Sequence, residues 1–246
     1  MVEAVAVSLD LGVGGARGLA RSRAPLAIAL AVLAGCTAEV SGSGTYGQVA
    51  YADLPALHGV RLDGEIEDVE VRVDVAMSGP QSVILSGDDN IVRDFVKLSV
   101  TEDGILEAHL QGGVHSVEPT IPIRIDATVA SFDTVDVTAS SAVRVTGAGV
   151  TSFDVVADGG STVTLAGAGG DALHAVLTDG SALDAQSYPA SGVELRVVSS
   201  DALVRLASPG TASGSASGTS GIQVLGSESG CSGIQLTAPA TCSASP

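Results

Sequence analysis

Short runs of alternating apolar and polar residues are the main pattern along this chain, and they return about every 20 residues. Clear copies are "FDTVDVTASSAVRVTG" from Phe132, "FDVVADGGSTVTLAG" from Phe153 and "LHAVLTDGSALDA" from Leu173. In the second copy Val163 and Leu165 face one way while Thr162 and Thr164 face the other, which is the period of a half-buried strand. Each copy is therefore expected to form a strand, a Gly/Ser/Asp corner and a second strand.

The copies align in columns, which predicts how they pack. One column holds Val143, Val163 and Leu183, and a second holds Ser141, Ser161 and Ser181. A unit this small cannot bury its own apolar face, so the copies must stack on one another as solenoid repeats do. A fainter copy, "VELRVVSSDALVRLA", is one residue out of step if Arg205 faces water, because Ala202, Val204 and Leu206 then face inward. We expect a bulge to absorb that residue.

The segment before the repeats has a different pattern. It predicts a strand with Val69, Val71, Val73 and Val75 inward, a strand over 82–86, and a "GDDN" turn that caps a short helical turn. A hairpin follows, in which strands 97–101 and 105–110 are joined at Asp103–Gly104. Ile121, Ile123 and Ile125 then lead into the first repeat.

This order resembles the GIN domain family, an auto-transporter adhesin head. The resemblance rests on the strand, the "GDDN" turn, the hairpin closed on "DG" and the run of repeats, and it covers residues 55–210. The corners "TASSA", "ADGGS" and "TDGSA" depart from the Ser-Gly-Ala-Gly-like corner usual in the family. The resemblance implies an all-β, single-stranded β-solenoid, similar to a right-handed β-helix, at a bacterial surface or in the periplasm. It supplies no catalytic motif.

Composition agrees with strands and turns. Hydrophobic residues make up 45% of the chain but aromatic residues only 2%, so the core must consist mainly of Val, Leu, Ile and Ala. The formal net charge is −17 over 246 residues, and residues 1–35 contribute none of it, because they hold three arginines and two acidic residues. A surface this negative repels nucleic acid, which excludes nucleic-acid-binding proteins.

The start of the chain predicts export. In "RSRAPLAIALAVLAGC", arginines flank a short apolar run, and small residues precede Cys36. Leu33 to Cys36 resembles the bacterial lipobox, which implies that residues 1–35 are a lipoprotein signal peptide and that Cys36 is diacylated. An ordinary cleaved signal that happens to contain a cysteine is the alternative. Residues 36–54, small and polar, are expected to be a flexible tether.

The two remaining cysteines lie in a Ser/Gly/Thr-rich tail, residues 211–246. In an exported chain with Cys36 acylated, Cys231 and Cys242 are left to pair, which predicts a disulfide. Two free thiols are the alternative.

Few residues are candidates for a catalytic or metal-binding role, and no catalytic residue, metal ligand or cofactor is assigned. The four histidines, His58, His109, His115 and His174, are interpreted as surface residues, with His109 at a strand end and His115 in a loop, and neither is joined by a cluster of metal-ligand spacing. The acidic run from Asp63 to Glu70 can hold calcium but is better explained as a solvated loop. "GAGGDAL" from Gly167 is read as an ordinary glycine corner.

The functional prediction is a lipid-anchored, non-catalytic binding or adhesin-like module of the bacterial cell envelope, at the outer membrane or cell surface. Its expected partners are the membrane, through the lipid, and a protein or glycan ligand. A structural envelope protein is one alternative. The other is a polysaccharide-acting β-helix enzyme, for which candidate carboxylates lie along the repeats: Asp136, Asp154, Asp158, Asp179, Asp184 and Asp201.

Overall fold

The computed structural model describes residues 38–76, 78–198, 201–207, 210–225 and 228–245. Strands make up most of this part of the chain, together with one short helix, α2 (Asp89–Asp94), and one turn of 3₁₀ helix, η1 (Glu228–Cys231). Among the described residues no helix is long and apolar enough to cross a membrane.

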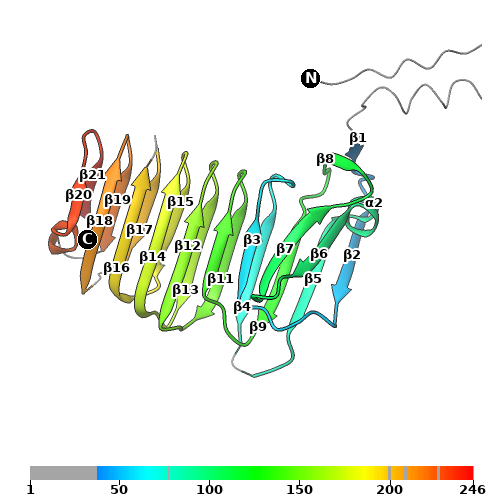
Figure 1. Ribbon diagram of the computed structural model, residues 1–246, viewed down its shortest axis with the longest axis horizontal. Coiled ribbons are helices and arrows are strands. Elements are labelled where there is room, and N and C mark those ends of the chain that lie inside the picture. Colours follow the sequence, from blue (N-terminus) through cyan, green and yellow to red (C-terminus); the bar gives the residue numbers. More distant parts are fainter. Residues whose placement is uncertain (1–37, 77, 199–200, 208–209, 226–227, 246) are drawn as a thin grey trace, which may run out of the picture. The chain divides into compact units, whose positions relative to one another are not determined.

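Residues 59–245 contain a stack of coils, and each coil gives one strand to each of two sheets (Figure 1). The coils are β3 (Gly59–Leu62) with β4 (Glu70–Val75), β10 (Thr134–Val137) with β11 (Ala142–Ala148), β12 (Ser152–Ala157) with β13 (Thr162–Gly167), β14 (Gly170–Thr178) with β15 (Ala182–Ser187), β16 (Ala190–Val198) with β17 (Leu203–Leu206), β18 (Thr211–Ser217) with β19 (Gly221–Leu225), and β20 (Ile234–Leu236) with β21 (Thr241–Ser245). Neighbouring coils pair in parallel throughout. The predicted all-β solenoid is confirmed.

The entry region extends the same two sheets with strands that pair both antiparallel and parallel. Its elements are β1 (Ala38–Ser41), β2 (Tyr46–Tyr51), β5 (Ser82–Asp88), α2, β6 (Val96–Val100), β7 (Ile105–Leu110), β8 (Val114–Glu118) and β9 (Arg124–Val129). The nine-stranded sheet runs β20-β18-β16-β14-β12-β10-β3-β7-β6, and the ten-stranded sheet runs β2-β5-β9-β4-β11-β13-β15-β17-β19-β21. Strands β1 and β8 form a separate parallel pair.

The core consists of inward columns that cross the sheets. Val143 pairs with Val163, Val163 with Leu183, and all three are buried, as the repeat alignment predicts. The column continues to Val204, 21 residues after Leu183, while Arg205 points outward. Since Leu173 and Val193 keep the 20-residue spacing on the other sheet, the extra residue falls in the corner between β16 and β17 and not in a bulge within a strand.

The corners explain the second column. Three of the corners turn through two consecutive residues with positive φ, a conformation that favours glycine. They are Ala139 and Ser140, Gly159 and Gly160, and Asp179 and Gly180. The next residue is the buried serine, and the N–H of Ser161 or Ser181 donates to the carbonyl three residues earlier. No hydrogen-bond partner for the Oγ atoms of Ser141, Ser161 and Ser181 occurs in the described part of the chain.

Two expected boundaries differ from the structure. Residues 38–51 of the expected tether contain β1 and β2, and the expected tail contains two further coils, β18 to β21. Small residues in these segments reflect close backbone approach and not a flexible chain. A Cβ at Gly47 would lie 2.3 Å from an Asp89 oxygen, and one at Gly214 would lie 1.8 Å from the Leu195 carbonyl.

Candidate functional site

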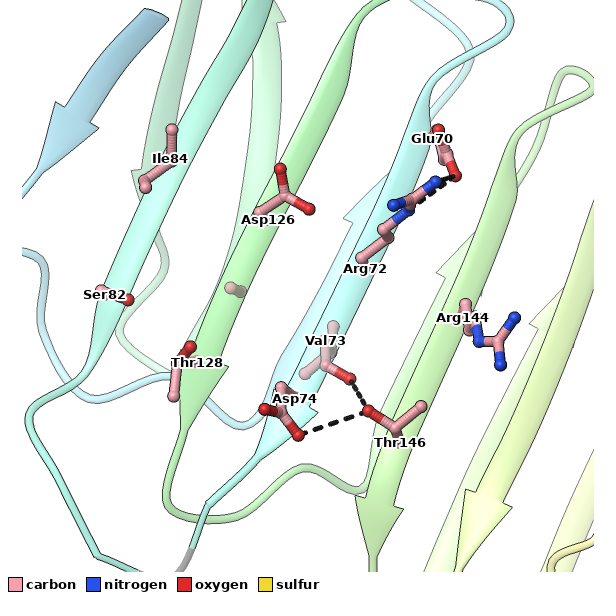
Figure 2. A pocket seen from close by; sticks show the side chains of 11 residues that line it. Glu70, Arg72, Val73, Asp74, Ser82, Ile84, Asp126, Thr128, Arg144 and Thr146 are labelled. Atoms are coloured by element: carbon pink, nitrogen blue, oxygen red, sulfur yellow. Dashed lines mark hydrogen bonds and ion pairs between the residues drawn. The ribbon is translucent and has the colours of Figure 1, made fainter.

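A hollow of about 490 Å³ lies on the outer face of the ten-stranded sheet, over β5, β9, β4 and β11 (Figure 2). We name it the β4 hollow. Here the antiparallel pair β5–β9 joins the parallel coils β4 and β11. Because side chains alternate along each strand, every second residue of these four strands points out into it. Its charged and hydroxyl lining includes Glu70, Arg72, Asp74, Asp126, Arg144 and Thr146.

One carboxylate, Glu70, binds two guanidinium groups, and Figure 2 shows it with the first of them, Arg72. Glu70 lies 2.6 Å from Arg72 of its own strand and 2.9 Å from Arg124 of the neighbouring β9. Partial burial raises the pKa of Glu70, but hydrogen bonds from Arg72 and Arg124 outweigh that effect and hold this pKa below its usual value. Glu70 is therefore ionised and fully engaged at neutral pH.

Charges of both signs remain unpaired beside this cluster. In the register of the sheet Asp126 lies beside Arg72, and Arg72 beside Arg144. Within the described residues neither Asp126 nor Arg144 forms an ion pair, and Arg144 extends away from Arg72 in Figure 2. Two strand spacings separate their positions, about 10 Å.

The lower part of the hollow presents hydroxyl groups. The Thr146 hydroxyl lies 3.2 Å from the Val73 carbonyl and 3.3 Å from an Asp74 oxygen, within hydrogen-bond distance of both. Ser82 of β5 and Thr128 of β9 lie opposite each other in the antiparallel ladder and complete the lining. The β4 hollow thus offers carboxylates, a guanidinium and hydroxyls, which suit a polar ligand.

Three of the histidines lie on strands, and His58 directly precedes β3. The His58 ring is hydrogen-bonded to the Asp133 carboxylate and to the Asp103 carbonyl, each at 2.7 Å. The bond to Asp133 raises the pKa of His58, and burial opposes this rise. His174 pairs with Glu194 at 3.2 Å on the outer face of the nine-stranded sheet. His115 lies within β8 and not in a loop as expected.

His109 has acidic neighbours that spacing along the chain did not reveal. Ligand atoms of Asp63, Glu65 and His109 all lie within 4.8 Å of one another, so the expectation that no acidic cluster joins His109 is wrong. The acidic residues belong to the loop after β3, which the parallel pairing of β3 with β7 brings beside His109. The two carboxylates are exposed, and Glu65 already accepts the N–H of Leu110 at 3.1 Å.

Of the aspartates considered for the enzymatic alternative, Asp158 and Asp179 interact through their side chains at neighbouring corners, while others occupy separate places. Asp154 lies between Thr134 and His174 on the nine-stranded sheet, while Asp184 lies on the ten-stranded sheet. Asp158 stabilises a corner, since its Oδ1 accepts hydrogen bonds from the Thr178 hydroxyl and the Gly159 N–H. Asp136 is paired with Arg61 at 3.0 Å.

The cysteines divide between the two ends of the chain. Cys231 of η1 and Cys242 of β21 are joined by a disulfide with a Cα–Cα distance of 5.9 Å. Cys36, the expected lipidation site, lies outside the described residues.

Comparison with known proteins decides the family. A family model described as "Putative auto-transporter adhesin, head GIN domain" matches residues 66–227. The chain belongs to this GIN-domain family. The match begins later and ends later than the expected 55–210, because the family pattern continues into β18 and β19.

Solved structures support the same fold. The chain resembles a crystal structure from Bacteroides fragilis described as a "putative adhesin", with a TM-score of 0.62, 12% identity, and coverage of 83% of this chain and 98% of that one. It also resembles a "Putative lipid binding protein" from Parabacteroides distasonis, with a TM-score of 0.53, 10% identity, and coverage of 84% and 97%. A comparison with curated proteins finds no match. At these identities the likeness concerns the fold alone.

Sequence reasoning missed the β4 hollow. The alternation of apolar and polar residues predicts that Arg72 and Arg144 point outward, but it does not predict which residues of other strands lie beside them. Arg124 reaches Glu70 across 54 residues, and the intervening entry strands are what bring β9 beside β4.

Proposed function

We propose that this GIN-domain protein is a non-catalytic, adhesin-like binding module of the bacterial cell envelope. The observation that carries the proposal is the β4 hollow, in which Asp126 and Arg144 lie unpaired, within the described chain, on the face of a continuously hydrogen-bonded sheet. A rigid scaffold that holds unpaired polar groups at fixed spacing is suited to recognition, because little conformational entropy is lost on binding.

The solenoid favours repeated contacts over a single deep pocket. Its outer faces carry rows of polar side chains at the strand spacing, for example Arg144, Thr164 and Asp184 in neighbouring coils. Many anchored copies, each with weak contacts, would gain by avidity. The family description as an adhesin head agrees with this role.

A binding test separates this proposal from its alternatives. The full chain is applied to an array of glycans and extracellular-matrix proteins, and we expect saturable binding to at least one class. An envelope protein with a purely structural role would bind none of them. Turnover of a polysaccharide that is abolished by Asp154→Asn or Asp179→Asn would favour the enzymatic alternative.

We also propose that Cys36 is diacylated and anchors the protein to the outer membrane or cell surface. The support is Leu33 to Cys36 after the short apolar run. Acyl chains add about 0.8 kcal/mol per buried CH₂, so several chains would hold the protein stably. Wild-type protein should fractionate with membranes, while Cys36→Ser should remain in the soluble fraction. An unmodified Cys36 in the mass spectrum of the mature protein would contradict the proposal.

A further inference from the structure

We propose that the β4 hollow binds a carboxylated sugar, with Arg144 holding the carboxylate and Asp126 and Asp74 accepting hydroxyl groups. This inference rests on the proposed binding function and names the class of its ligand.

Ion pairs are unevenly distributed around the β4 hollow. The chain has 28 acidic residues for 11 basic ones, so arginines have ample carboxylates to pair with. Yet Arg72 and Arg124 both bind Glu70, which leaves Asp126 without a basic partner and Arg144 without an acidic one among the described residues. The Arg144 guanidinium is therefore available to a carboxylate from outside the chain.

Arg144 determines which charged group the ligand carries. The Arg144 guanidinium is a planar group with five N–H donors that match a carboxylate in two parallel hydrogen bonds. Arg144 is exposed, and its sheet neighbours Arg72 and Thr164 offer no negative charge. A carboxylate bound there therefore has no negative side chain directly beside it in either neighbouring strand.

The lining of the β4 hollow favours a sugar over a peptide. A peptide gains affinity from main-chain hydrogen bonds at a sheet edge, but β4, β9 and β11 are central strands whose backbones pair on both sides. What remains on the face is side chains: carboxylates of Asp74 and Asp126, and hydroxyls of Ser82 and Thr128. Sugar hydroxyls both donate and accept, so they match such a mixed set.

Size and shape agree with one or a few sugar rings. The hollow of about 490 Å³ lies within the range of about 300–1,000 Å³ found for small-molecule sites. Ile84 lines the β5 side and gives the C–H face of a ring an apolar contact.

The test uses the full chain and short oligosaccharides of galacturonic acid. Their counterparts with each carboxyl reduced to a primary alcohol keep the same rings without the charge. We expect the acidic sugars to bind and the reduced ones to bind at least about tenfold more weakly, the effect of one charged hydrogen-bonded pair. Arg144→Ala should produce the same loss, and Arg144→Lys should restore part of it.

Arg196→Ala is the matched control, because Arg196 is exposed on β16 of the other sheet and does not line the hollow. It removes the same charge and should leave binding unchanged, and thermal melts check that each variant is folded. Equal binding of acidic and reduced sugars, or no effect of Arg144→Ala, would overturn the carboxylate assignment. Arg144-dependent binding of a Glu-rich peptide in place of the sugar would also overturn it.

The outcome also distinguishes this inference from the proposed function. Binding of neutral glycans or matrix proteins without acidic sugars would refute the carboxylated ligand and leave the binding module in place. If no glycan or protein binds at all, both fail.

Discussion

Asp88 shows how one residue organises the entry to the solenoid. It is fully buried, and its carboxylate accepts the N–H groups of Gly44, Thr120 and Ile121 at 2.6–2.8 Å. The "GDDN" pattern predicts the short helix that follows, but not this role. Asp88 occupies the N-cap position without a side-chain cap bond, because its oxygens reach loops 44 and 32 residues away in the chain.

Replacement of Asp88 should therefore be costly. Asp88→Asn keeps the shape but puts an NH₂ group where one oxygen now accepts two N–H groups. We expect a loss of about 3 kcal/mol or more in unfolding free energy, measured by denaturant melts. Asp89→Asn is the control, since Asp89 is part exposed and pairs with Arg93 within the helix, and it should cost about 0.5 kcal/mol or less. Equal costs for the two variants would contradict the role of Asp88.

At the scale of the strand, alternation predicts which side chains are inward and can be tested within one segment. Val163 of β13 is fully buried between Val143 and Leu183, while Thr164 lies on the outer face between Arg144 and Asp184. Val163→Asp would bury an unpartnered carboxylate, which costs several kcal/mol and should unfold the neighbouring coils.

Thr164→Asp places the same charge in water and should cost about 1 kcal/mol or less. The pair of variants cancels the general effect of added negative charge, and thermal melts measure the difference. A larger loss from Thr164→Asp would show that the inward column is misassigned.

Strand positions were predictable from the sequence wherever pairing follows the repeat. A fixed spacing of 20 residues places Val143 beside Val163 without any further information. The entry strands have no such period, so the sequence could not place Arg124 beside Glu70 or Asp63 beside His109. The candidate site lies at this junction, and for that reason its residues were found only in the structure.

At the scale of the whole molecule, amino-acid composition predicted the boundaries of the domain incorrectly. Ser- and Gly-rich segments indicate flexible linkers in general. Here small residues in 211–245 form two more coils in register, and the inward column that includes Leu183 and Val204 continues through Ile222 to Cys242. Close backbone approach at Gly214 and Gly233 requires the small residues.

Within the described residues β20 and β21 form the last coil of the stack, and the Cys231–Cys242 disulfide joins η1 to β21 there. Leu236 of this coil pairs with the buried Ala216 yet is 44% exposed. A solenoid opens most readily from its ends, since a terminal coil has only one neighbour. The disulfide, which closes a loop with a sequence separation of 11, should restrain this opening by about 3 kcal/mol at most.

We therefore predict that the double variant Cys231→Ser/Cys242→Ser folds but frays from this end. Amide hydrogen exchange should accelerate in β19, β20 and β21 and remain unchanged in β11 and β13, which are six or more strands away along the chain. Intact mass should rise by about two hydrogens when the wild type is reduced, and reduction should produce the same exchange pattern. Uniformly faster exchange over all coils would mean that the stack unfolds as one cooperative unit and would contradict fraying from this end. Free thiols in the untreated protein would show that the disulfide does not form.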